Sequence, residues 1–187
     1  MHIIECPPIP FSTPIYEGMN HGAEIDIHGE PTCGYERNFV IELLTREGIA
    51  LHMNARHGYM GEHTLVVNSM ECGRWMHEDR HCNPFHEDRH FHLKIKNHGS
   101  HFSIHVNGHH ICHFHHRIPP HNIVALGIRG DVRVHKIHFE HFHHHNGGGF
   151  EVGRGVWMEE HHPHHHHYGH HHHHHHEFGH HHHHHHC

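Results

Sequence analysis

The chain has 187 residues, a length that suits one domain with its own hydrophobic core and is marginal for two. Hydrophobic residues make up only 34%, and histidine, with 46 positions, accounts for the deficit. The formal net charge of −7 treats every imidazole as neutral, but about a quarter of unperturbed imidazoles carry a proton at pH 7, so the real charge depends on pH. No apolar run approaches the ~18 residues of a membrane span, and no basic cluster favours nucleic-acid binding.

The N-terminal residues and the cysteines bear on the cellular compartment. Residues 1–7, which we expect to form an N-terminal extension, lack the basic and apolar regions of a secretory signal peptide. The six cysteines are irregularly spaced and include no C-x-x-C pair. This pattern favours free thiols, with a framework of three disulfides as the alternative.

Short apolar runs recur between turn signals from about residue 23 to residue 142. The runs are residues 25–27, 39–44, 49–53, 65–67, 91–96, 102–107, 123–126 and 132–134. In the fifth run Phe91, Leu93 and Ile95 alternate with polar residues, which is the period-two pattern of a strand with one wet face. Residues 97–100 and the Asn107-Gly108 pair are typical hairpin connections. The spacing predicts an all-β sandwich.

The chain changes character after Phe142. Residues 143–160 form a Gly-rich linker, and residues 161–187 hold a repeat with two runs of seven histidines and almost nothing apolar to bury. We therefore expect the tail to be disordered. Imidazole is a common ligand of Zn, Cu and Ni, so the tail is expected to respond to metal or to pH. The candidate ligands are His170, His172, His174, His176, His180, His182, His184 and His186.

A terminal histidine run also raises the alternative of a purification tag. Residues 1–145 already contain 26 histidines, far more than an ordinary segment of that length. A tag would explain only the end of the chain, so the enrichment favours a bias of the whole sequence.

Polar side chains that suit sugar hydroxyls are concentrated between Leu51 and Arg80. Three of them occupy alternate positions from residue 52, which places them on one face of a strand. Planar donors and acceptors suit hydroxyl groups, and an aromatic ring suits the apolar face of a pyranose. The candidate site consists of His52, Asn54, Arg56, Asn68, Trp75, Glu78 and Arg80.

These residues stand in three motifs: H-M-N-A-R at 52–56, V-V-N at 66–68 and W-M-H-E-D-R at 75–80. In them the chain resembles the galectins, the β-galactoside-binding lectins of animals. The resemblance extends over about residues 8–142 and implies a jelly-roll β-sandwich of two antiparallel sheets that forms a carbohydrate-recognition domain. It implies no enzymatic activity and no cofactor for sugar binding. It also implies glycoprotein and glycolipid partners, a homodimer as one assembly, and a cytoplasmic or extracellular location reached without a signal peptide.

The resemblance assigns roles to the candidate residues. The side chains of His52, Asn54 and Arg56 are expected to hold the axial 4-hydroxyl of galactose. A site built around an axial hydroxyl rejects glucose, because its buried polar groups would then lack partners. Trp75 is expected to stack under the sugar ring.

The other three residues complete the assignment. Asn68 and Glu78 are expected to hold the 6-hydroxyl, and Glu78 and Arg80 to reach the next sugar. The chain departs from the family at two positions within these motifs and at Asp88, where the family usually has a glycine. Ala55 replaces a proline and is expected to loosen the loop that presents Arg56, and Met76 replaces a glycine and adds bulk beside the tryptophan.

Other functions compete with this interpretation. Residues 77–81 and 86–90 both read H-E-x-x-H, the zinc-peptidase motif, which requires a helix. Pro84 separates the copies and strands are expected on both sides, so no helix of useful length fits. With so many histidines, about one chance match is expected. The remaining alternatives are a metal-storage or metal-sensing protein on a lectin scaffold and a matrix protein crosslinked through the tail.

Overall fold

Two antiparallel β-sheets lie face to face in the computed structural model, which describes residues 1–142. The six-stranded sheet has the order β1-β13-β3-β9-β10-β11. Its strands are β1 (His2–Glu5), β13 (Val132–Glu140), β3 (Glu24–Pro31), β9 (Phe91–Asn97), β10 (His101–Val106) and β11 (His109–His115).

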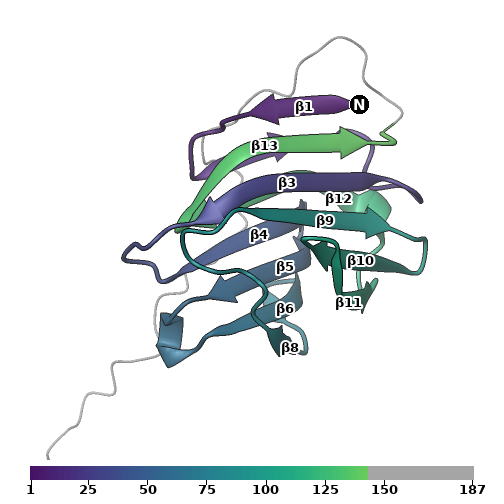
Figure 1. Cartoon of the computed structure of the whole chain (residues 1–187). Coiled ribbons are helices and arrows are strands. Elements are labelled where there is room, and N and C mark those ends of the chain that lie inside the picture. Colours follow the sequence, from purple (N-terminus) through teal and green to yellow (C-terminus); the bar gives the residue numbers. More distant parts are fainter. Residues whose placement is uncertain (143–187) are drawn as a thin grey trace, which may run out of the picture.

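The second sheet has seven strands in the order β2-β12-β4-β5-β6-β7, with β8 also paired to β6. These strands are β2 (Phe11–Pro14), β12 (Ile123–Gly130), β4 (Asn38–Thr45), β5 (Gly48–Arg56), β6 (Thr64–Glu71), β7 (Arg74–Trp75) and β8 (Asp79–Cys82). Two short 3-10 helices, η1 (Tyr59–Gly61) and η2 (Pro120–Asn122), lie in connections. In Figure 1, β1, β13, β3 and β9 follow one another from the top, and β12 passes behind them.

The hydrophobic core lies between the sheets because alternate residues of each strand face inward. On β9, Phe91, Leu93 and Ile95 are buried, whereas His92, Lys94 and Lys96 are half-buried on the outer side. The inward residues of β4, β5 and β6 join the same core. The predicted all-β sandwich of two antiparallel sheets is therefore confirmed for residues 1–142, while the predicted disordered tail lies outside the described residues.

The predicted hairpin connections are also present. Residues 98–100 join β9 to β10, and Asn107 and Gly108 join β10 to β11. Asn107 has a φ of 52° and Gly108 a φ of 78°. Two successive positive φ angles are what a two-residue hairpin turn of the primed type requires, and an Asn-Gly pair tolerates them best.

The structure bears on two further predictions, one about the N-terminal residues and one about the thiols. Residues 2–5, assigned to an N-terminal extension, form an edge strand that pairs with β13. The five cysteines within residues 1–142 are free thiols, as expected, and Cys187 lies outside that range. Burial raises the pKa of the Cys112 thiol to about 12, so this cysteine packs as an apolar side chain. No helix within residues 1–142 is long and apolar enough to cross a membrane.

Candidate functional site

Strand β5 presents three of the predicted site residues on the outer face of the seven-stranded sheet. His52, Asn54 and Arg56 occupy alternate positions, while Met53 and Ala55 between them face the core. Register pairs His52 with Asn68 on β6. The sequence predicted the shared face of the first three residues, and the strand pairing adds the fourth.

These residues line one cleft of about 530 Å³. Six of the seven predicted site residues contribute to its wall, and Arg80 stands just beyond it. Further lining residues come from the loop before β4, from η1 and from β12. The full lining is Glu36, Asn38, His52, Asn54, Arg56, Tyr59, Met60, Val66, Asn68, Trp75, Met76, Glu78 and Arg129.

A chain of ion pairs runs along one side of the cleft. Glu62 accepts hydrogen bonds from Arg56 and from Arg80, and Arg80 also donates to Glu78 at 2.9 Å. The hydrogen bonds from the two guanidinium groups hold the pKa of the Glu62 carboxyl below its usual value. Glu62 therefore stays ionised at neutral pH and fixes the position of both arginines.

The guanidinium of Arg56 is held from a second direction. Its Cζ lies 5.3 Å from the centre of the Tyr59 ring, a cation–π distance. The side chain is largely buried, and its Nε has no hydrogen-bond partner among the described residues. A buried donor without a partner costs free energy, so the Tyr59 ring and Glu62 hold the guanidinium in place at some cost.

His52 lies between a carboxylate and an aromatic ring. Its Nδ1 is 3.4 Å from an oxygen of the buried Glu42, which also pairs with Arg129 at 3.2 Å. The imidazole meets the Trp75 ring edge-on, with 4.6 Å between ring centres. Since Nδ1 faces Glu42, the opposite ring nitrogen, Nε2, is the one that faces away from this carboxylate.

The two site amides are oriented by the protein. Asn54 accepts a hydrogen bond at its Oδ1 from Asn38 at 3.0 Å, which leaves the Asn54 NH₂ group as a donor. Asn68 accepts at its Oδ1 from the Ser69 backbone and from Arg117, and donates one hydrogen to the Met76 carbonyl. Its second amide hydrogen remains as the donor for a ligand.

The structure shows where the two residues that depart from the galectin motifs lie. Ala55 lies inside β5, paired with Phe39 and Leu65 and buried in the core, so the prediction of a loosened loop is wrong. Alanine keeps the backbone N–H that proline lacks and can continue the ladder to Arg56. Met76 is 42% exposed and lines the cleft next to Trp75, where the sequence placed its extra bulk.

Sequence reasoning missed several residues that shape the cleft. Glu62 joins the two arginines, Asn38 orients Asn54, and Tyr59 packs on Arg56. An acidic residue between two arginine-bearing strands was the available signal for Glu62. The other two depend on the pairing of β4 with β5 and on the η1 turn, which the residue pattern did not specify.

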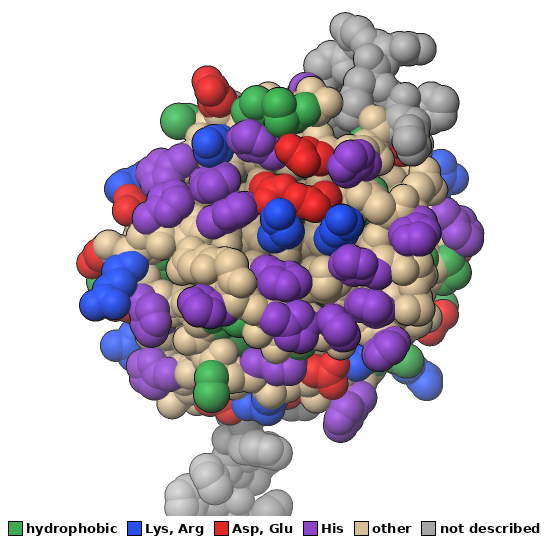
Figure 2. Space-filling view, turned by 45° about the vertical axis from the view of Figure 1, so that its right-hand side comes forward, with side chains coloured by type: hydrophobic (Ala, Val, Ile, Leu, Met, Phe, Trp, Pro, Cys, Tyr) green, Lys and Arg blue, Asp and Glu red, His purple; other side chains and the backbone are tan. Residues whose placement is uncertain are grey.

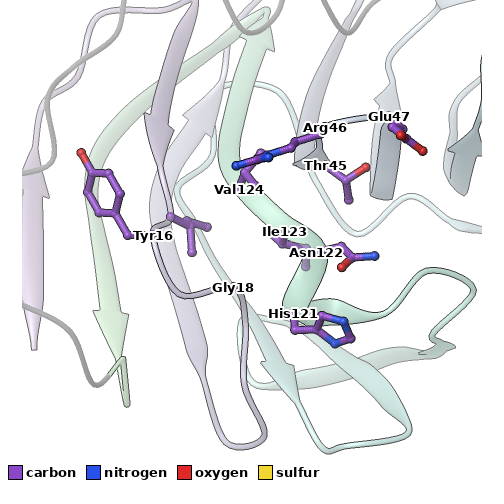
Figure 3. A pocket seen from close by; sticks show the side chains of 10 residues that line it. Tyr16, Gly18, Thr45, Arg46, Glu47, His121, Asn122, Ile123 and Val124 are labelled. Atoms are coloured by element: carbon purple, nitrogen blue, oxygen red, sulfur yellow. The ribbon is translucent and has the colours of Figure 1, made fainter.

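A second cleft of about 510 Å³ lies where β4 and η2 end and β12 begins. Its side chains include Thr45, Arg46 and Glu47, and Tyr16 and Glu47 lie at opposite ends of it in Figure 3. The Tyr16 ring is 72% exposed and none of the seven predicted residues contributes. The chemistry of a sugar site is therefore concentrated in the cleft over β5 and β6.

The H-E-x-x-H motifs lie within the described residues, whereas the histidine runs of the tail do not. Neither H-E-x-x-H copy lies on a helix: residues 79–82 form β8, and residues 86–90 form a turn and irregular chain. The two imidazoles of each copy therefore lack the helical spacing that a zinc peptidase uses. The predicted metal ligands of the tail, from His170 to His186, lie outside the described residues.

Comparison with known proteins agrees with the fold and the cleft. The model of the galactoside-binding lectin family matches residues 10–139. A Caenorhabditis elegans protein described as "probable galaptin lec-8" is 34% identical over 161 residues, covering 86% of this chain and 83% of its own length. A 32 kDa β-galactoside-binding lectin of the same organism is 32% identical, over 68% of this chain and 45% of its own.

Solved structures give the same answer. The crystal structure of C. elegans galectin LEC-6 matches with a TM-score of 0.70 and 36% identity, over 75% of this chain and 96% of that chain. The family match covers more than half of the sequence, and the matched residues include the whole cleft. This chain belongs to the galactoside-binding lectin family, the galectins.

Proposed function

We propose that the cleft over β5 and β6 binds β-galactosides of the lactose or N-acetyllactosamine type on glycoproteins and glycolipids. The observation that carries the proposal is the convergence of His52, Asn54, Arg56, Asn68, Trp75 and Glu78 on one cleft. Their side chains offer several directed donors, one carboxylate and one aromatic ring, as hydroxyls and the C–H face of a pyranose require.

Recognition of galactose is assigned to β5. In this proposal the axial 4-hydroxyl lies against His52, Asn54 and Arg56, all of which are less than 9% exposed. The Arg56 guanidinium, held by Glu62, and the Asn54 NH₂ group, held by Asn38, supply donors whose geometry is set before the sugar arrives. An equatorial hydroxyl would leave these buried groups without partners, at a cost of about 1–3 kcal/mol each.

The rest of the cleft serves the ring and the second sugar. Trp75 is half-buried and its ring contacts the His52 imidazole, so the indole provides a fixed platform for the apolar face of galactose. The remaining Asn68 hydrogen and the Glu78 carboxylate are placed for the 6-hydroxyl. Glu78 and Arg80 are both about two-fifths exposed and extend toward the position of the following glucose or N-acetylglucosamine.

Calorimetric titration of the full chain with lactose and with cellobiose tests the proposal. The two disaccharides differ only in the configuration of one hydroxyl, the 4-hydroxyl of the non-reducing sugar. We expect lactose to bind at least about 100-fold more tightly than cellobiose, because the buried donors on β5 require the axial group. Equal affinities, or no binding of lactose, would contradict the proposal.

The remaining predictions from the sequence are separate from this test. Metal binding or pH response by the tail, assembly as a homodimer and a cytoplasmic or extracellular location stay predictions. The metal-storage and matrix alternatives depend on the same tail residues. Sugar binding by residues of β5, β6 and β7 needs none of them.

A further inference from the structure

The outer face of the six-stranded sheet carries most of the described strand histidines. Figure 2 shows histidine on both sides of a central row of acidic and basic side chains. On this face Glu24 is paired with Lys94 at 3.1 Å and with Lys96 at 3.9 Å. Glu24 therefore has basic partners, and the histidines form a distinct chemical group.

One group of imidazoles covers the hairpin formed by β10 and β11, and we call it the histidine hairpin. Its members are His98, His101, His105, His110, His113 and His115. Strand register places His101 opposite His115 and His105 opposite His110. Phe102, Ile104 and Phe114 face the core, so the pleat directs these histidines outward.

The imidazoles of the hairpin contact one another in a continuous row. Ring centres are 4.3 Å apart for His101 and His113, and 4.4 Å apart for His113 and His110. The row continues to His98 and to His105, each at 5.2 Å from its neighbour. Cross-strand pairs at such separations bring ring nitrogens within reach of a shared ligand after side-chain rotation.

The ring nitrogens of the hairpin are only partly occupied. Serine hydroxyls contact one nitrogen of His98 and one nitrogen of His101, at 2.7 and 2.8 Å, which leaves the opposite nitrogen of each ring. Nδ1 of His105 has no hydrogen-bond partner among the described residues. Within residues 1–142 none of the six imidazoles forms an ion pair with a carboxylate, whereas His92 outside the hairpin pairs with Asp26 at 2.6 Å.

The chemistry of this row suits a metal ion, because the hairpin places several imidazoles side by side. Neutral imidazole presents a lone pair, and it is the common ligand of Zn²⁺, Cu²⁺ and Ni²⁺. A row of imidazoles without carboxylates resists several separate protons but can share one coordinated cation.

We propose that the histidine hairpin is a surface site for a borderline divalent metal ion such as Zn²⁺, with His101 and His113 as the central ligands and His98 or His110 as the third. The only three ligand atoms that already lie within 4.8 Å of one another in residues 1–142 are carboxylate oxygens of Glu24, Asp26 and Glu140, and Glu24 among them is paired with Lys94. At the hairpin the ion draws exposed rings together. This site is independent of the sugar cleft, which lies on the other sheet.

Residue-resolved carbethoxylation of histidines by diethylpyrocarbonate tests the site in the full chain, because mass spectrometry of peptides separates the hairpin from the tail. Zn²⁺ is added in excess over the tail histidines. We expect the modification rates of His101 and His113 to fall at least about fivefold, since coordinated nitrogen cannot react. His109, exposed at the start of the same strand, and His121 on η2 are the internal controls and should keep their rates.

A matched pair of variants then separates coordination from general shielding. In His113→Asn, His101 should react in the presence of Zn²⁺ at its metal-free rate, and in His109→Asn it should remain protected. Lactose affinity and the thermal transition of both variants verify that they fold. Unchanged rates of His101 and His113 with Zn²⁺ would overturn the proposal, as would equal protection of His109 and His121 or continued protection of His101 in His113→Asn.

Discussion

The two outer faces of the sandwich use the same alternation of residues but treat their polar groups in opposite ways. Over β5 and β6 the polar side chains are buried and tied to protein partners, as Asn54 is to Asn38 and Arg56 to Glu62. Over β10 and β11 the imidazoles are more exposed and mostly meet one another. The first face holds its donors in fixed directions, and the second leaves its ligands able to rotate.

This difference fits two kinds of ligand. A sugar epimer is distinguished by the direction of one hydroxyl, so its site must be rigid before binding. A metal ion can collect its ligands from side chains that move, provided that they are neutral and close. Substitutions confined to one face should leave the other face intact, and their effects measure what each face contributes.

The largest effect is expected from Trp75→Ala. Loss of the platform and its buried area should weaken lactose binding by about 2–4 kcal/mol, or about 30- to 1000-fold. Calorimetric titration of wild type and variant measures this loss. Tyr16→Ala, which removes an exposed aromatic ring from the other cleft, is the matched control and should bind lactose as wild type does. Equal affinities for Trp75→Ala and wild type would remove the tryptophan from the site.

Arg56→Lys should be the next most damaging change although it keeps the charge. The planar guanidinium binds Glu62 and, in the proposed site, a sugar hydroxyl as well, whereas an ammonium is a point donor and cannot reproduce the fork. We expect lactose affinity to fall about 10- to 100-fold. Arg46→Lys, in the second cleft, is the control. A lysine variant that binds lactose within about twofold of wild type would contradict this role of Arg56.

His28 on the histidine-rich face should make folding sensitive to acid. Burial and the charges of neighbouring histidines and Lys136 lower its pKa to about 4, below the ordinary value of 6.5. Between these values the unfolded chain binds a proton that the folded chain does not, so the unfolding free energy falls as pH decreases from 6.5 to about 4.

Denaturant unfolding of the full chain at several pH values in this window measures the effect. His28→Gln should unfold with a pH dependence smaller by up to about one proton than wild type, since glutamine does not titrate. His121→Gln, on η2, serves as the matched control. The same pH dependence in wild type and His28→Gln would show that this imidazole does not couple protonation to folding.

The smallest effect is expected from Met76→Ala. The methionine side chain lines the cleft beside Trp75 and is only partly covered, so its removal opens space without breaking a hydrogen bond of the backbone at that residue. We expect the ratio of lactose to N-acetyllactosamine affinity to change by about two- to fivefold. An unchanged ratio in parallel titrations would mean that the methionine does not contact the second sugar.

The sequence predicted the site better than it predicted what supports the site. Alternate positions on one strand suffice to place His52, Asn54 and Arg56 together, because the pleat has a period of two. Glu62 and Tyr59 could not be placed in the same way. Their positions depend on the η1 turn, where Met60 adopts a positive φ of 53°, and on distant strand pairing.

The fold shows the same division. Strands β9 and β10 were predicted to within a residue of their ends, whereas β12 and β13 run well past the predicted stretches 123–126 and 132–134. Strand β11 is absent from the predicted apolar runs because its inward residues, Cys112 and Phe114, stand among histidines that mask the alternation, although the Asn107-Gly108 turn predicted a hairpin there. Ala55 was expected to loosen a loop that presents Arg56, whereas it continues the ladder of β5.

Lactose binding over β5 and β6 can be located residue by residue by amide NMR of the isotope-labelled full chain during a lactose titration. We expect the largest shift changes at His52, Asn54 and Asn68 and at the Trp75 indole, with cellobiose producing none of them at the same concentration. Lactose-dependent shifts confined to Thr45, Arg46 and the other residues of the second cleft would contradict the account.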